Sequence, residues 1–185
     1  MLRTSTFQEV CKSKSLDLEI ARLNKILNDY PENIKSLEEL GAIYYYQVKD
    51  DVAIEIYEKL RKLEPNNSNI RAVLGFLYYE VDRLDEAIEE MNCALDLSPD
   101  SPFVLFMLGN TYSRAGRIRE AVDCYDLAIF LDFDIEQAHL DFAKKYEDMG
   151  RLKCSLREYK AALTYSKTDV KVKEKIKKLE KEING

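Results

Sequence analysis

The sequence of 185 residues has few of the residues and motifs that catalytic, metal and disulfide sites require. It has one histidine, no tryptophan and four widely spaced cysteines with no CxxC pair. No GxSxG, HExxH or phosphate-binding glycine loop occurs in it. We therefore expect a non-enzymatic protein without catalytic residues, a bound cofactor, a metal site or a disulfide framework.

Long apolar runs are also missing. No segment approaches the roughly 20 apolar residues of a membrane-spanning helix. The first fifteen residues, MLRTSTFQEVCKSKS, lack the apolar core of a signal peptide, so we expect a cytoplasmic protein without a membrane span. With 46% hydrophobic and 34% charged residues, and only six glycines and four prolines, the composition is typical of a folded, helical chain.

The chain does have a pattern that recurs every 34 residues. In its clearest copy, residues 68–101, the sequence SNIRAVLGFLYYEVDRLDEAIEEMNCALDLSPDS predicts two amphipathic helices, at 68–81 and 84–97. A connection this short makes the two helices antiparallel neighbours. Gly75 and Ala87 carry almost no side chain, as two helices need where their backbones approach most closely.

Residues at fixed places in this pattern resemble the tetratricopeptide repeat. The matches are Leu37, Leu40, Gly41, Tyr44, Ala53, Tyr57 and Pro65 in one copy, Leu74, Gly75, Tyr78, Ala87, Ala94 and Pro99 in the next, and Leu105, Leu108, Gly109, Tyr112, Ala121, Tyr125 and Ala128 in the third. The resemblance implies an all-α fold, a right-handed superhelix (α-solenoid) of antiparallel helix pairs.

The register of the repeats predicts a single domain over residues 1–185. It comprises a degenerate N-terminal repeat at 1–33, well-matched repeats at 34–67, 68–101 and 102–135, a weaker repeat at 136–169, and a solvating, capping C-terminal helix at 170–185. Phe133 replaces the family's proline, so we expect a less sharp boundary there. The one histidine, His139, stands where the family packs a bulky residue, which favours a core residue over a catalytic base.

In the family, the first helix of each repeat lines a concave groove. Here the side that faces the groove carries six aromatic residues, although an amphipathic helix is normally polar on the side that its own fold does not bury. An aromatic strip on a surface usually marks a binding site. The predicted groove for a partner's apolar segment consists of Tyr45, Tyr46, Asn69, Phe76, Tyr79, Phe103, Phe106, Asn110, Arg114 and Lys144. Alternatively, the rings pack against neighbouring first helices, or the N-terminal segment folds into the groove.

One class of partner is not expected. Family members that bind the acidic C-termini of cytosolic chaperones use lysine, asparagine and arginine side chains at five places in the repeats. Those places hold Glu38, Ala42, Val73, Phe103 and Met107. The side chains that would bind a carboxylate are therefore missing.

The resemblance implies a protein–protein interaction module: an adaptor, an assembly factor or a chaperone-like protein. Two alternatives stay open: a self-assembling scaffold in which one copy's groove receives a terminus or the capping helix of another, and the recognition part of a longer enzyme. From Arg151 onward the chain has eleven basic and five acidic residues, so its net charge of +6 leaves −12 on the preceding residues. This polarity suits a contact between the basic end of one copy and the acidic flank of another, as in a homo-oligomer, or between the basic end and an anionic surface, but a lysine-rich, solvated cap is the more ordinary explanation. The basic end lacks the clustered aromatics of a nucleic-acid-binding surface.

Overall fold

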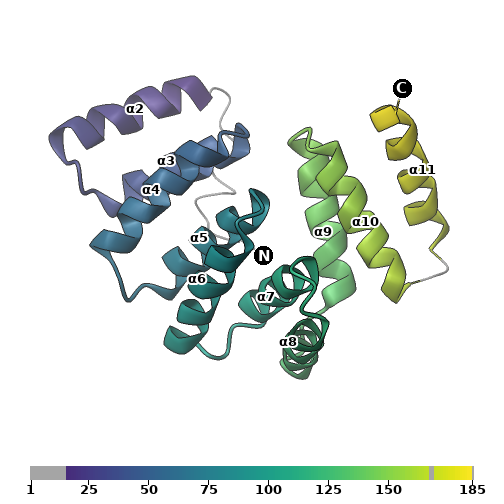
Figure 1. The fold of residues 1–185 in the computed structure, drawn as a ribbon. Helices are drawn as coiled ribbons and strands as arrows, with labels where there is room; N and C mark the ends of the chain where they lie inside the picture. The colour runs from purple at the N-terminus through teal and green to yellow at the C-terminus, as the bar shows by residue number, and fades with distance from the viewer. Residues whose placement is uncertain (1–15, 167–168, 185) are drawn as a thin grey trace. The chain divides into compact units, whose positions relative to one another are not determined.

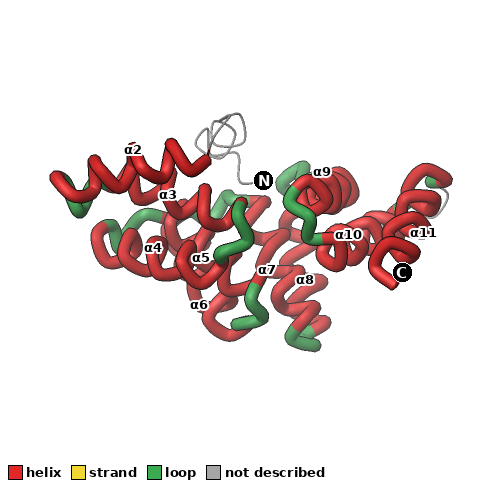
Figure 2. Tube along the Cα trace, turned by 90° about the horizontal axis from the view of Figure 1, so that it is seen from above, coloured by secondary structure: helices red, strands yellow, loops and turns green. Residues whose placement is uncertain are grey.

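The computed structural model describes residues 16–166 and 169–184, and these residues form helices joined by short loops, with no strand among them (Figures 1 and 2). The helices are α2 (Leu16–Asp29), α3 (Ile34–Tyr46), α4 (Asp50–Leu63), α5 (Ser68–Glu80), α6 (Leu84–Leu97), α7 (Pro102–Arg114), α8 (Ile118–Phe130), α9 (Ile135–Asp148), α10 (Leu152–Tyr165) and α11 (Val170–Asn184). The predicted all-α class of antiparallel helix pairs is confirmed. The first helix of the degenerate N-terminal repeat, and the alternative that this segment fills the groove, lie outside the described residues.

The chain divides into two compact units, residues 1–131 and residues 132–185, and each is described by itself. In the first unit, α3 packs with α4, α5 with α6, and α7 with α8, while α2 packs on α3. In the second unit, α9 packs with α10, and α11 covers α10. The single domain expected over residues 1–185 remains a prediction.

The two helices of each pair are joined through one residue with left-handed backbone. These residues are Val48, Asp82, Gly116 and Gly150, with φ between 61° and 75°. They recur every 34 residues because the turn is part of the repeat. In each turn, the residue after the left-handed one donates its backbone N–H to a tyrosine carbonyl near the end of the first helix. An example is the bond from Arg117 N to Tyr112 O at 2.9 Å. This bond satisfies a carbonyl that the helix end would otherwise leave unpaired.

Two glycines allow the helices of a pair to approach closely. A Cβ atom on Gly75 would lie 2.8 Å from Met91 Cγ and 3.2 Å from the carbonyl oxygen of Ala87. One on Gly109 would lie 2.6 Å from Tyr125 Cε1. The expected close contact between Gly75 and the second helix is therefore confirmed, and it fixes the spacing of α5 and α6.

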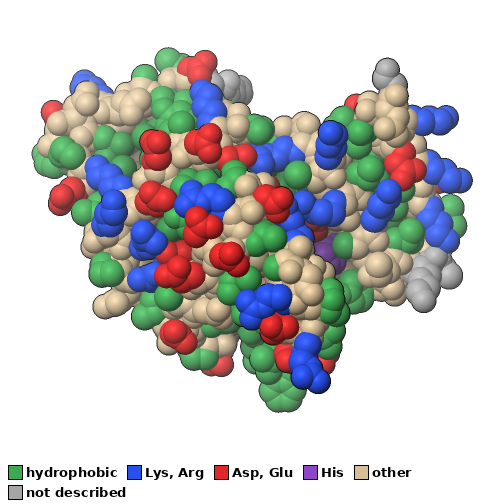
Figure 3. All heavy atoms as spheres, viewed as in Figure 1, with side chains coloured by type: hydrophobic (Ala, Val, Ile, Leu, Met, Phe, Trp, Pro, Cys, Tyr) green, Lys and Arg blue, Asp and Glu red, His purple; other side chains and the backbone are tan. Residues whose placement is uncertain are grey.

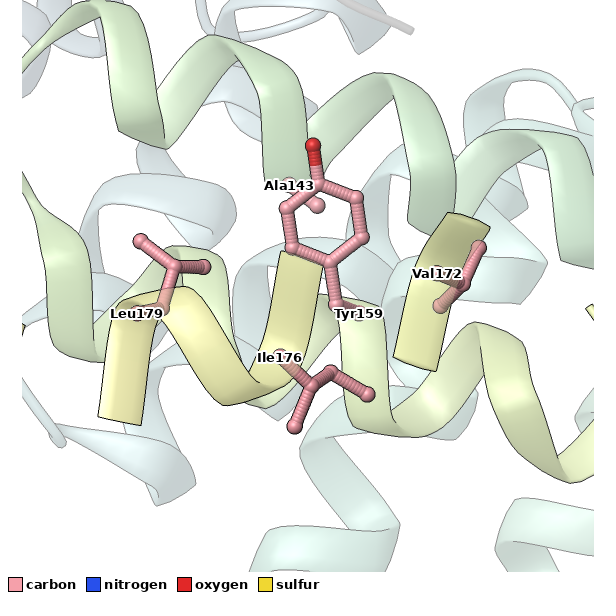
Figure 4. Close-up of a cluster of buried hydrophobic side chains, with 5 residues drawn as sticks. All are labelled: Ala143, Tyr159, Val172, Ile176 and Leu179. Atoms are coloured by element: carbon pink, nitrogen blue, oxygen red, sulfur yellow. The ribbon is translucent and has the colours of Figure 1, made fainter. Parts of the chain in front are cut away.

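The second unit is closed by α11. Val172, Ile176 and Leu179 are buried on its apolar side and form one cluster with Tyr159 of α10 and Ala143 of α9 (Figure 4). The lysines of α11 lie on its other sides, where most are exposed. An amphipathic helix of this kind covers the apolar flank of the last pair and presents charge to water.

Candidate partner-binding surface on the first helices

The predicted groove residues come from four first helices. Those of α3, α5 and α7 all belong to the first unit. Lys144 is exposed on α9 and belongs to the second unit. Within the first unit the structure brings Tyr45 and Phe76 into contact, whereas Asn69 lies exposed in the first turn of α5.

The helices α5 and α7 are buried on all sides. Every residue of 73–79 and of 104–112 is buried. Seven consecutive residues make nearly two helical turns, so this burial cannot come from one face alone. Sequence periodicity predicts an apolar face toward the second helices, and the opposite face turns out to be covered as well.

Four of the six predicted aromatic rings are almost fully buried. Phe106 and Phe76 are 0% and 1% exposed, and Tyr45 and Tyr79 are each 3% exposed. Tyr45 and Phe76 meet edge to face, with ring centroids 5.4 Å apart. Since these two rings belong to α3 and α5, adjacent first helices are joined partly through the predicted groove residues, as one of the alternatives expects.

Arg114 is held against the end of α5. Its guanidinium carbon lies 4.3 Å from the centroid of the Tyr79 ring, and Nη1 donates to the Tyr79 carbonyl oxygen at 2.8 Å. Nη2 forms an ion pair with Asp82 at 2.8 Å. A cation is favourable here because the carbonyls of a helix C-terminus carry partial negative charge. Arg114 thus joins α7 to the C-terminus of α5.

Asn110 also has a partner inside the first unit. It is 8% exposed, and its Oδ1 accepts a hydrogen bond from the hydroxyl of Tyr125 on α8 at 2.7 Å. The Tyr125 ring also packs on Phe106, with centroids 6.5 Å apart. In the sequence, Tyr125 matches the family's aromatic position, but its contacts with Asn110 and Phe106 were not predicted. The remaining members, Tyr46 and Phe103, are partly exposed.

Two buried carboxylates were not predicted. Glu90 on α6 is 2% exposed and forms ion pairs with Arg61 of α4 and Arg71 of α5. In the second unit, Glu158 is 4% exposed and lies 2.8 Å from Nδ1 of the buried His139. The prediction that His139 is a core residue is therefore confirmed. The signal in the sequence was that Glu90 and Glu158 stand at the same place in their repeats.

A third missed feature is the outer surface of α8. Exposed hydrophobic side chains gather there, at the bottom of the view in Figure 3. The sequence signal was available, since Ile118, Val122 and Ile129 recur at helical spacing.

Within residues 16–166 and 169–184, no group of three or more His, Cys, Asp or Glu side chains is arranged to hold a metal ion. Of the helices that the structure describes, none has the length and hydrophobicity needed to cross a membrane.

Comparison with known proteins supports the repeat assignment. A family model described as tetratricopeptide repeat matches residues 104–134. No curated protein matches the chain. Among solved structures, "MamA MSR-1 C2" is 32% identical over 66% of this chain and 71% of its own, with a TM-score of 0.59. "MamA AMB-1 P212121" is 30% identical over 71% of this chain and 73% of its own, with a TM-score of 0.61.

A longer alignment extends the likeness in fold. The structure described as "Crystal structure of MamA" covers 89% of this chain and 96% of its own with a TM-score of 0.66, at 22% identity. Together with the helix pairs, their left-handed turns and the glycines between them, these matches confirm the resemblance seen in the sequence. The chain belongs to the tetratricopeptide repeat proteins.

Proposed function

We propose that this chain is a non-enzymatic adaptor, assembly factor or chaperone-like protein that binds an apolar segment of a partner along its first helices. The fold itself supports a protein-interaction or scaffold module. The observation that supports the finer proposal is that two of the predicted rings, Tyr46 and Phe103, stay partly exposed on the first helices α3 and α7. Accessible aromatic rings on first helices offer a partner apolar contact area.

The rings would supply most of the binding free energy. Phenylalanine and tyrosine bury a large area and lose little side-chain entropy, and each filled anchor contributes roughly 1–3 kcal/mol. Tyr46 and Phe103 are partly exposed as the structure stands. Phe76 and Phe106 are closed off, so a partner reaches them only if their present neighbours give way.

The polar members have unequal roles in this proposal. Asn110 and Arg114 already bond within the first unit, so they position the rings more than they contact a partner. Asn69 is exposed in the first turn of α5 and can bond the backbone of a bound segment. Lys144 belongs to the second unit and is not part of this proposal.

The test places a photocrosslinking amino acid on the surface without removing any buried ring. It replaces Asn69, and in a matched control it replaces Asn92, which is equally an exposed asparagine but lies on the second helix α6. After irradiation in lysate of the source cells, we expect one or a few covalent adducts at position 69 that are absent at position 92. No adduct at position 69, or the same adducts at both positions, would contradict the proposal.

A second variant pair tests the rings themselves. Truncating Phe106 is uninformative, because removing a fully buried phenylalanine costs roughly 3–5 kcal/mol whatever its role. Tyr46→Ala and Phe103→Ala remove partly exposed rings instead. We expect these two variants to lose the adduct at position 69 while keeping their helicity by circular dichroism.

A further inference from the structure

Glu38 on α3 differs from the other carboxylates of the first unit. Its side chain is partly buried, yet no hydrogen bond or ion pair joins it to another of the described residues 16–131. Every other aspartate or glutamate in that range that is at least partly buried has a hydrogen bond, an ion pair or another electrostatic partner. Glu90, for example, pairs with Arg61 and Arg71.

The helix itself does not compensate this charge. Glu38 is the fifth residue of α3, so it lies beyond the first turn, where the partial positive charge of a helix N-terminus acts. Its neighbours are acidic: burial, followed by the fields of Glu64 and Glu39, raises the pKa of the Glu38 carboxyl. The free protein thus holds a partly buried carboxylate beside other carboxylates and without a donor.

Glu38 lies on the same side of α3 as a ring of the proposed peptide site. Ala42 and Tyr46 follow it at intervals of four residues, so the three side chains run along one side of the helix. Tyr46 is partly exposed. Eight residues of α-helix span about 12 Å, a distance that an extended peptide covers with about four residues. One bound segment can therefore contact both Tyr46 and Glu38.

Glu64 connects this acidic place to the start of α5. Its Oε2 accepts a hydrogen bond from Nδ2 of Asn67 at 2.6 Å. Asn67 is the N-cap of α5, and its side chain accepts a bond from the backbone N–H of Asn69 at 3.1 Å. Glu64 thus lies near both Glu38 of α3 and the first turn of α5, which carries the exposed side chain of Asn69.

We propose that the segment bound on the first helices carries a lysine or arginine that pairs with Glu38. A carboxylate that is partly withdrawn from water and lacks a donor is unfavourable, and a cation from the partner relieves this cost. The neighbouring carboxylates make the same place reject an acidic residue. This proposal rests on the proposed peptide site, because it names the chemistry of the segment bound there.

Unfolding in urea gives a test that needs no peptide. Glu38→Gln should unfold at the same urea concentration as the wild type or at a higher one, because the variant removes a charge that nothing in the free protein compensates. Glu90→Gln changes a carboxylate with two arginine partners and should unfold at a lower concentration. A loss in Glu38→Gln as large as that in Glu90→Gln would overturn the proposal, since Glu38 would then have a partner within the chain.

Selection from random peptides displayed on phage tests the chemistry of the segment. Peptides selected on the wild-type chain should share apolar residues and one lysine or arginine. Those selected on Glu38→Gln should keep the apolar residues and lose the preference for the basic one. The matched control Glu55→Gln removes an exposed carboxylate from the second helix α4 and should select the same peptides as the wild type.

Fluorescence anisotropy with one selected peptide, and with a copy whose basic residue is replaced by glutamine, measures the pairing. The replacement should weaken binding to the wild type about tenfold and leave binding to Glu38→Gln unchanged. Selected peptides without a basic residue, or an equal loss on both proteins, would overturn this proposal and leave the peptide site in place. If no peptide were selected on any of the proteins, the proposed function would fail and this proposal with it.

Discussion

Replacing His139 by leucine should destabilise the second unit, because Glu158 would lose its buried partner. Nδ1 of His139 lies 2.8 Å from Oε2 of Glu158, where the Nδ1–H tautomer donates to the carboxylate, and the two side chains are only 6% and 5% exposed. The other carboxylate oxygen accepts from Nε of Arg157 at 3.0 Å. His139→Leu therefore leaves a buried carboxylate with one donor fewer.

The size of the loss follows from these contacts. A hydrogen bond to a charged group contributes about 1.5–3 kcal/mol, and an unsatisfied buried group adds its own desolvation cost. In the variant, Arg157 still compensates part of the charge on Glu158. A leucine also retains part of the packing against Tyr165, whose ring stacks on that of His139 with the centroids 6.1 Å apart. We expect the free energy of unfolding to fall by about 2–3 kcal/mol.

The chain supplies the compensating change. His139 and Glu158 are the fourth and twenty-third residues of their repeat. The same two places hold Leu37 and Ile56, Arg71 and Glu90, and Leu105 and Cys124 in the three repeats before it. Each pair is either apolar at both places or charged at both. The double variant His139→Leu/Glu158→Cys copies the apolar pair of the neighbouring repeat and should lie within about 1 kcal/mol of the wild type.

Urea unfolding followed by far-ultraviolet circular dichroism measures all four proteins of this double-mutant cycle. The expected coupling free energy is about 2 kcal/mol, well above the few tenths seen for independent sites. Additive losses in the double variant would refute the reasoning, as would a His139→Leu variant as stable as the wild type. Either result would mean that the carboxylate does not depend on the histidine.

Two further predictions concern a turn and a thiol. Gly116→Ala should lower the free energy of unfolding, measured in urea, by about 1 kcal/mol. The cause is backbone strain alone, since φ is 75° and a Cβ there meets no atom within 4 Å. An unchanged urea midpoint would contradict this. Burial, together with Asp123 and Glu120, raises the pKa of the Cys124 thiol to about 11. At pH 8 the folded protein should therefore alkylate Cys124 at roughly one hundredth of the rate in urea, as peptide mass spectrometry can follow, and equal rates would contradict it.

The helix pairs could be predicted from the sequence because the forces that define them are local. The 3.6-residue periodicity and the short polar turns predicted a helix at 84–97, and α6 has these bounds. The helix predicted at 68–81 ends one residue earlier, at Glu80. There the turn needs Asp82 in the left-handed region, which periodicity does not report.

The boundary where Phe133 replaces proline shows another limit. The sequence predicts that the next repeat starts at 136, and its first helix begins one residue earlier, at Ile135. Its N-cap is Asp134, whose side chain accepts from the backbone N–H of Gln137 at 2.9 Å. Without a proline to fix the end of the repeat, the capping aspartate sets the start of the helix.

The burial of the predicted groove could not be predicted, because it depends on contacts between distant parts of the chain. Periodicity shows which side of α5 carries Phe76 and Tyr79, but the side alone does not tell what covers it. The same pattern of rings would suit an open groove or a packed layer of first helices. Side-chain partners such as Tyr125 for Asn110 lie on another helix and follow only from the assembled structure.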